Sequence, residues 1–168
     1  MTTPEQTAGD FSERVGHRFP GGVVTVPHWE NWLFCDAVLA DHPAYRSAEA
    51  ASELGYPAPI VHPGLVYFAC VRGAHITFAE IFELMDFDER DGPMFGEQKM
   101  IFSEPVFEGI EYLASGGITD VTRKEGKRAG VFDIVTFEIK LTSGGREVVR
   151  TTSSFVLPRR RLSPDGAA

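Results

Sequence analysis

Three ionisable side chains lie in two short proline-containing segments, and their chemical types suit proton transfer. Asp41 and His42 come directly before Pro43, and His62 comes directly before Pro63. A carboxylate and an imidazole can each accept or donate a proton near neutral pH. Asp41, His42 and His62 are therefore candidates for general acid–base catalysis, provided that the fold brings them to a common cavity.

Each of the three residues also has a purely structural interpretation. Asp commonly accepts hydrogen bonds from nearby backbone at turns, which would explain Asp41. His42 could face solvent at a helix end, and His62 could be a loop residue satisfied by a backbone carbonyl. Geometry decides between the interpretations, because a general base must lie within hydrogen-bond reach of the proton that it takes.

The overall charge argues against a nucleic-acid surface. The chain has a formal net charge of −8, whereas nucleic-acid phosphates are neutralised by a basic stripe. A metal site is not expected, since the five histidines show no His-x-x-x-His spacing and no pairing with cysteine. Cys35 and Cys70 are far apart in apolar stretches, which predicts two buried, reduced thiols.

The length and the ends of the chain predict one domain with short tails. Residues 1–10 are polar and lack the apolar core of a signal peptide. No apolar run approaches the roughly 20 residues of a membrane span. We therefore expect a cytoplasmic protein with one domain at 11–161 and flexible tails at 1–10 and 162–168.

The first half of the chain has helical patterns. After a short β-branched strand at 23–26, apolar spacing predicts a helix from Trp29 to about Ala40, and Pro43 disfavours its continuation. Ser47 is a suitable N-cap for a second, short helix. The longest apolar segment, 65–84, begins with two turns that have no polar face, which predicts a helix buried on all sides.

The second half has the alternating patterns of strands. Four runs are expected to form them: 96–103, 110–122, 131–141 and 147–157. Gly144-Gly145 predicts a tight hairpin turn between the last two. Helices followed by an antiparallel meander define an α+β class, with the sheet curved around the buried helix.

Several local motifs follow one another in a recognisable order. They are Asp41-His42-Pro43-Ala44-Tyr45, Ile60-Val61-His62-Pro63-Gly64, Gly96-Glu97-Gln98 and Glu104-Pro105-Val106-Phe107-Glu108-Gly109. Together they resemble the MaoC-like dehydratase/hydratase family, most closely the fatty-acid-synthase-type dehydratase domains and the mycobacterial-type hydroxyacyl-carrier-protein dehydratase subunits. The resemblance implies a single hot-dog fold, an antiparallel sheet wrapped around a long buried central helix.

The resemblance also implies a hydro-lyase activity, the reversible addition of water to a trans-2-enoyl thioester on CoA or an acyl carrier protein. No separate cofactor is implied, since CoA or phosphopantetheine is part of the substrate. Backbone N–H groups at the start of the central helix would polarise the thioester carbonyl. Pro63 has no N–H, so Gly64 and Leu65 are the expected donors. The candidate pocket residues are Tyr45, Tyr67 and Trp32.

The chain departs from the family pattern at the catalytic dyad. Aligned without gaps from Phe34 and Pro43, the family's Asp falls on Ala40 and its His on Tyr45. One interpretation is an active hydratase or dehydratase that uses shifted groups. The alternative is a non-catalytic substrate-binding subunit, paired with a dyad-bearing subunit that resembles it. Either form is expected to be a dimer, homomeric or heteromeric, with sheets joined edge to edge.

A third possibility is a hot-dog thioesterase that uses a carboxylate on or near the central helix. The available helix carboxylates are Glu80 and Glu83, both near the far end of the apolar segment. Basic residues leave a further question open. Arg159-Arg160-Arg161 could be a solvated terminal run or could contact the phosphates of CoA or phosphopantetheine. The looser basic set of Arg123, Lys124, Lys127 and Arg128 has the same ambiguity.

Overall fold

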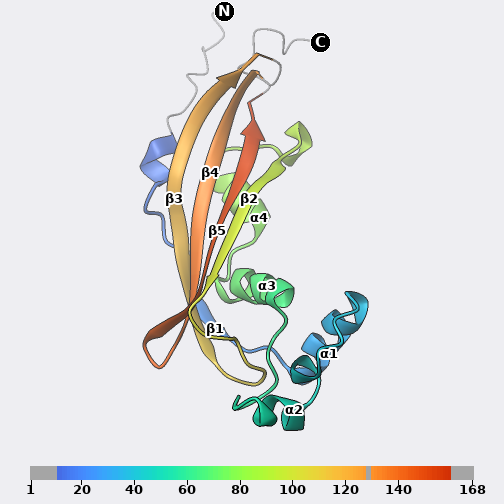
Figure 1. The fold of residues 1–168 in the computed structure, drawn as a ribbon. Coiled ribbons are helices and arrows are strands. Elements are labelled where there is room, and N and C mark those ends of the chain that lie inside the picture. The colour runs from blue at the N-terminus through green and yellow to red at the C-terminus, as the bar shows by residue number, and fades with distance from the viewer. Residues whose placement is uncertain (1–10, 128–129, 160–168) are drawn as a thin grey trace, which may run out of the picture.

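The computed structural model describes residues 11–127 and 130–159, and its main element is one curved antiparallel sheet (Figure 1). The strands are β1 (Gly22–Val24), β2 (Met94–Phe102), β3 (Tyr112–Gly126), β4 (Gly130–Ser143) and β5 (Arg146–Pro158). They lie in the order β1-β3-β4-β5-β2, and all neighbours are antiparallel. Helix α3 (Pro63–Gly73) packs against the inner face of this sheet.

Alternation along β4 explains which face of the sheet is buried. Its inward side chains, Val135, Phe137, Ile139 and Leu141, are at most 1% exposed, whereas the residues between them are partly exposed. Successive side chains of a strand point to opposite faces, so this alternation directs the apolar set toward the helices. Gly144 and Gly145 both have left-handed backbone and form the expected hairpin turn. The predicted α+β class is confirmed. The predicted four-strand meander is correct only for β3, β4 and β5, because β2 pairs with β5 and not with β3.

The other helical elements are short. They are η1 (Phe11–Arg14), α1 (His28–Ala37), η2 (Pro43–Tyr45), α2 (Ala48–Glu53), α4 (Phe78–Leu84) and η3 (Glu89–Asp91). Ser47 caps α2 as predicted, because its hydroxyl accepts the N–H of Ala50 at 3.3 Å. Close packing of α3 on the sheet needs Gly73, since a Cβ there would lie 2.8 Å from side-chain atoms of Val24 and Ala114.

The segment 65–84 is not one helix, and that prediction is wrong. It forms α3 and α4, which are bent by 53° relative to each other. His75 has left-handed backbone with φ 52°, and Thr77 begins α4 with a capping box to Glu80. A strong N-cap inside an apolar run thus ends one helix and starts another. Burial on all sides is also wrong for the isolated chain, because Phe68 on α3 is 57% exposed.

The basic residue at the end of β5 is part of the core. Arg159 is buried, donates to Asp133 Oδ2 at 2.8 Å and to the carbonyls of Met85 and Asp86, and stacks on Phe11. Neither a solvated run nor a phosphate contact is therefore correct for this residue.

The looser basic set is also partly structural, because the Arg123 guanidinium pairs with the same Asp133 carboxylate. Lys124 and Lys127 are exposed. Arg160, Arg161, Arg128 and the predicted tails at 1–10 and 162–168 lie outside the described residues.

Within the described ranges no single helix is long and apolar enough to cross a membrane; α3 and α4 meet that test only as a bent pair. The same ranges contain no group of three or more His, Cys, Asp or Glu side chains that could hold a metal ion. Both cysteines are buried and free, as predicted. Burial raises the pKa of Cys70 to about 12.

Candidate functional site

The segment that carries Asp41 and His42 connects α1 to η2, and both residues are exposed there. His42 is the N-cap of η2, where its Nδ1 accepts the N–H of Ala44 at 3.3 Å. The fixed φ of Pro43 suits the first position of a helical turn, which explains why the chain turns at this point. No side-chain hydrogen bond of Asp41 is found in the described part of the chain, so it is not positioned by a partner there.

His62 has the corresponding place at the start of α3. Its Nδ1 accepts the N–H of Gly64 at 3.1 Å, and Pro63 is again the first helical residue. Burial lowers the pKa of His62, which favours the neutral imidazole. When Nδ1 of a neutral imidazole accepts a hydrogen bond, the ring proton is on Nε2. His62 therefore presents an N–H donor rather than a free basic nitrogen.

Aromatic contacts bring two of the three predicted catalytic residues into one row. The ring of Tyr45 lies between those of His42, at a centroid distance of 5.7 Å, and His62, at 5.4 Å. Phe34 of α1 continues the row, 5.2 Å from His62. Asp41 is not among these contacts. Tyr45, where the family has its His, is thus the central member of the row.

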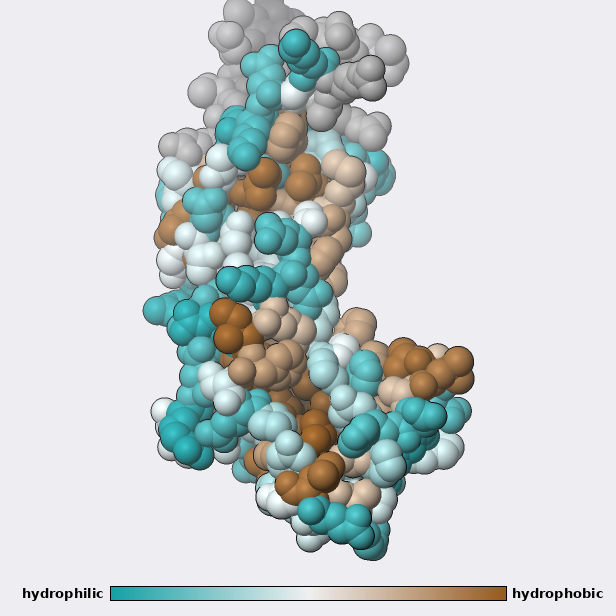
Figure 2. Space-filling view, in the orientation of Figure 1, coloured by the Kyte–Doolittle hydropathy of each residue, from teal (hydrophilic) through white to brown (hydrophobic). Residues whose placement is uncertain are grey.

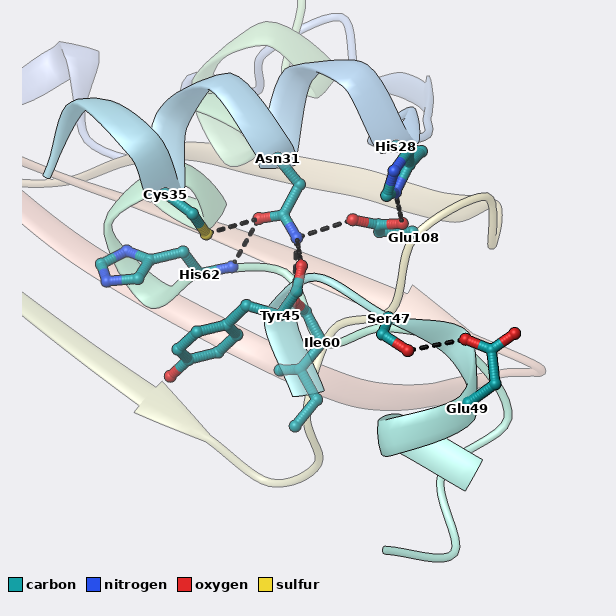
Figure 3. Close-up of polar contacts among 9 residues, drawn as sticks. All are labelled: His28, Asn31, Cys35, Tyr45, Ser47, Glu49, Ile60, His62 and Glu108. Atoms are coloured by element: carbon teal, nitrogen blue, oxygen red, sulfur yellow. Dashed lines mark hydrogen bonds and ion pairs between the residues drawn. The ribbon is translucent and has the colours of Figure 1, made fainter. Parts of the chain in front are cut away.

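A buried amide on α1 holds this arrangement together (Figure 3). Asn31 Nδ2 donates to the carbonyls of Tyr45 and Ile60, at 3.1 and 3.0 Å, and to Glu108 Oε1 at 2.7 Å. Asn31 Oδ1 accepts the backbone N–H of His62 at 2.9 Å. We call these five residues the Asn31 network. The rings of Tyr45 and His62 project from it on the same side.

The network ends at an exposed histidine. Glu108, itself buried, places its second oxygen 2.8 Å from His28 Nδ1. Sequence reasoning missed Asn31, Glu108 and His28. A signal was present, since Asn31 and Cys35 are four residues apart and share one helix face. Both are fully buried, whereas Trp29 and Leu33 of the same helix are more than half exposed.

The two predicted carbonyl donors have partners within the chain. The N–H of Gly64 donates to His62 Nδ1, and that of Leu65 to the carbonyl of His62 at 2.9 Å. A thioester carbonyl that binds the N–H groups of Gly64 and Leu65 must share or displace their hydrogen bonds to His62. Their role therefore stays a prediction, and His62 Nε2–H is the additional donor that the geometry offers at this helix end.

The predicted pocket residues do not share one cavity in the isolated chain. Tyr45 belongs to the ring row, Tyr67 packs edge-on against Phe68 and Phe95, and Trp32 is exposed beneath the guanidinium of Arg46. A mostly apolar cavity of about 280 Å³ lies beside the ring row. Its lining residues flank the start of α3 and the end of β2: Ile60, Val61, Pro63 and 102–106.

Glu80, one of the two carboxylates that a thioesterase could use, is already bound within the chain. Glu80 accepts the backbone N–H and the hydroxyl of Thr77 at 2.7 and 2.8 Å. These bonds lower the pKa of Glu80, and they hold the carboxylate at the start of α4. Glu83 is exposed on the same short helix, and neither residue belongs to the ring row. The carboxylate that the structure does place in the site is Glu108, which is bound to Asn31 and His28 and is not on the central helix.

Comparison with known proteins identifies the class. The model of the FAS1-like dehydratase domain region matches residues 13–152. Mesaconyl-CoA hydratase of Haloarcula hispanica is 30% identical over 145 residues, covering 83% of this chain and 36% of that protein. The chain thus spans about a third of that relative.

Solved structures agree with this match. The HadBC (3R-hydroxyacyl-ACP dehydratase) complex of Mycobacterium tuberculosis is 26% identical with a TM-score of 0.66, covering 83% of this chain and 92% of that one. A MaoC-like dehydratase of Rhodospirillum rubrum, 19% identical, has a TM-score of 0.64 over 90% and 98% of the two chains.

The curved sheet around α3 is therefore a hot-dog fold. The chain belongs to the FAS1-like dehydratase region family, within the MaoC-like group of hydratases and dehydratases.

Proposed function

We propose that this chain is the non-catalytic, acyl-thioester-binding subunit of a heterodimeric hydratase or dehydratase, whose dyad-bearing partner supplies the catalytic Asp and His. The observation that carries the proposal is the state of the two histidines in the ring row. His42 and His62 each accept a backbone N–H through Nδ1. A neutral imidazole in this state has no free lone pair to accept the α-proton of a substrate.

The residues at the family's dyad positions support the same conclusion. Ala40 has no ionisable side chain, and its backbone carbonyl accepts a hydrogen bond from the Arg46 guanidinium. Tyr45 has a phenol where the family has an imidazole, and a phenol is a poor general base near neutral pH. The ring row can still bind a thioester. His62 Nε2–H is a neutral donor that can polarise a carbonyl without moving a proton.

An unpartnered apolar surface supports a heterodimer. Strand β2 is an edge of the sheet, and its exposed residues include Met94, Phe95, Ile101 and Phe102. The unpaired N–H and C=O groups of an exposed edge strand are a template for pairing with another chain. Helix α1 and the turn that follows it add Trp29, Trp32, Leu33, Val38 and Leu39. Figure 2 shows apolar side chains gathered at the projecting end of α1. The HadBC relative is named as a complex, which favours a partner of the same fold.

Restoring the dyad tests the proposal. The double variant Ala40→Asp, Tyr45→His should hydrate crotonyl-CoA or dodecenoyl-CoA, whereas the wild-type chain should bind but not convert them. The matched control, Ala40→Asn with Tyr45→His, should be about 10²-fold slower than the restored dyad, because it lacks the carboxylate. Hydration by the wild-type chain alone would instead support the active interpretation, with His42 and His62 as the catalytic groups.

A further inference from the structure

Three hydroxyl groups are buried between α3 and β5 and have no hydrogen-bond partner of good geometry among the residues that the structure describes. They are Tyr67 Oη, Thr151 Oγ1 and Ser153 Oγ. Thr151 and Ser153 are two residues apart on β5 and only 1% exposed. The Ser153 hydroxyl lies close enough to Tyr67 to lower its pKa in part, although burial has the larger effect and the pKa is raised overall. We call these three residues the hydroxyl cluster.

The strand neighbours of the cluster are mostly apolar. On the β2 side of β5, Met100 lies opposite Thr151, and Gln98, the one polar neighbour among these described pairs, lies opposite Ser153. The residues of β4 directly opposite Thr151 and Ser153 are Ile139 and Phe137, both buried and apolar. The next inward residues of β5, Val149 and Phe155, are apolar as well. A buried hydroxyl without a partner costs free energy, so native structures usually supply a water or a ligand to such a group. The cluster is a polar spot in a mostly apolar wall.

The place of the cluster relates it to the ring row. Tyr67 follows Gly64 by three residues, so the two lie on one face of α3, about one turn apart. An acyl chain whose thioester carbonyl binds near His62 and then runs along α3 would pass Tyr67. Tyr67 makes ring contacts with Phe68 and Phe95, and Phe68 in turn contacts Phe34 of the ring row, so Tyr67 is linked to the row through two rings.

We infer that the hydroxyl cluster binds a neutral oxygen substituent, a hydroxyl or a keto group, on the acyl chain beyond the carbons that react. This inference rests on the proposed thioester-binding function. Each hydroxyl can donate and accept, which suits a neutral oxygen in either role. The cluster contains no cation, so a buried carboxylate would lack a counter-charge there. The substrate class is therefore an oxygenated acyl thioester rather than a plain alkyl one.

Access to the cluster lies past the edge strand. The Phe95 ring packs edge-on against both Tyr67 and Phe155, and it is about half exposed. The pairing of β2 with β5 has a register shift between Phe95 and Gln98. A bulge bends its strand and interrupts the ladder locally, and bulges are frequent at sheet edges and next to active sites. Displacement of Phe95 would open a path from the edge of the sheet to the cluster.

Calorimetric titration with non-hydrolysable thioether analogues tests the inference on the full chain. The ligands are an alkyl-CoA and isosteric analogues that carry one hydroxyl at successive carbons beyond the third. The wild-type chain should bind one hydroxylated analogue about tenfold more tightly than the alkyl-CoA, as expected for one additional hydrogen bond. Tyr67→Phe and Thr151→Val should each remove this preference. Thr152→Val, on the outer face of β5, is the matched control and should keep it.

The outcomes separate the inference from the proposed function. Binding of alkyl-CoA with no preference for any hydroxylated analogue would overturn the inference and leave the proposed function standing. A preference that survives both variants would overturn it too. Failure of every analogue to bind would refute thioester binding itself. A fall in Tm for Thr151→Val without ligand would show a structural water at the cluster, and would also overturn the inference.

Discussion

Asn31 Oδ1 and the backbone N–H of His62 form a 2.9 Å hydrogen bond across 31 residues of chain. This bond fixes the start of α3 relative to α1. The same amide binds the carbonyl of Tyr45, so the positions of both ring-row residues depend on one buried side chain. A buried side chain of a helix therefore positions the site, although the ring-bearing side chains lie in short connecting segments.

Asn31→Ala should lower the free energy of unfolding by about 3–5 kcal/mol. The substitution leaves several buried groups without partners, and each costs roughly 1–3 kcal/mol. Urea denaturation measures this value. Asp36→Ala, an exposed residue of the same helix, is the control and should change it by less than about 0.5 kcal/mol. A cost below about 1 kcal/mol for Asn31→Ala would mean that water replaces the amide.

Asp133 should make the stability of the fold depend on acid pH. Burial alone would raise the pKa of Asp133, but hydrogen bonds and charge from Arg123 and Arg159 outweigh it, and the pKa is lowered. A carboxyl with a lowered folded-state pKa stabilises the fold above its unfolded pKa of about 3.9, and this contribution is lost as pH falls through the folded pKa. The free energy of unfolding should therefore fall below about pH 4, and this part of the pH dependence should be absent in Asp133→Asn.

The ion pair between Asp133 and Arg159 gives a second test, which is made at one pH. Asp133→Ala should cost about 3–5 kcal/mol at neutral pH, since it leaves Arg159 buried with its charge unpaired. Lys140→Ala, which removes a partly exposed ion pair with Glu138, should cost no more than about 1 kcal/mol. Equal effects of the two substitutions would show that Arg159 finds another partner.

Cys70 should react slowly with thiol reagents in the folded protein. With a pKa of about 12, roughly one thiol in 10⁴ is ionised at pH 8, against about one in four for an ordinary cysteine. Burial also raises the pKa of Cys35. Ellman's reagent should therefore modify neither thiol until the chain is unfolded. A Ser52→Cys variant, exposed on α2, should react at once. Rapid modification of the wild type would contradict the burial of α3 on the sheet.

Much of the fold could be predicted from the sequence, because alternation on the strands and apolar spacing in the helices each have a local cause. The Gly144-Gly145 hairpin, the Ser47 cap and the alternation along β4 all follow from short-range patterns. The pairing of β2 with β5 joins strands that are distant in sequence, so local patterns did not predict it. The break between α3 and α4 depends on one capping box within an apolar run, so hydropathy alone conceals it.

The site was harder to predict, since its central residue is defined by contacts distant in sequence. Asn31 lies in a helix whose apolar residues suggested the buried face, but Trp29 and Leu33 point outward and Asn31 points inward. Hydropathy locates a helix without saying whether its apolar face meets the core or another chain. For the same reason, the sequence could not show that His42 and His62 both act as caps.

The unpaired edge of β2 should associate with another chain. Purified alone, the protein should self-associate through this edge, and Ile101→Lys should shift it toward monomer with little change in stability. Charged residues on an edge strand disfavour edge-to-edge pairing. Sedimentation velocity over a range of concentrations measures the effect, and Glu111→Lys, exposed outside β2, is the control. A wild-type chain that stays monomeric throughout would count against pairing at β2.

The most direct test of the central claim measures the ultraviolet absorbance of the enoyl thioester when the pure chain is added to crotonyl-CoA and dodecenoyl-CoA, with binding measured in parallel. We predict saturable binding without loss of absorbance, because no base in the ring row has a free lone pair. Loss of absorbance that depends on the chain, and that falls about 10²-fold in His62→Ala as expected for a general acid–base group, would contradict the non-catalytic assignment.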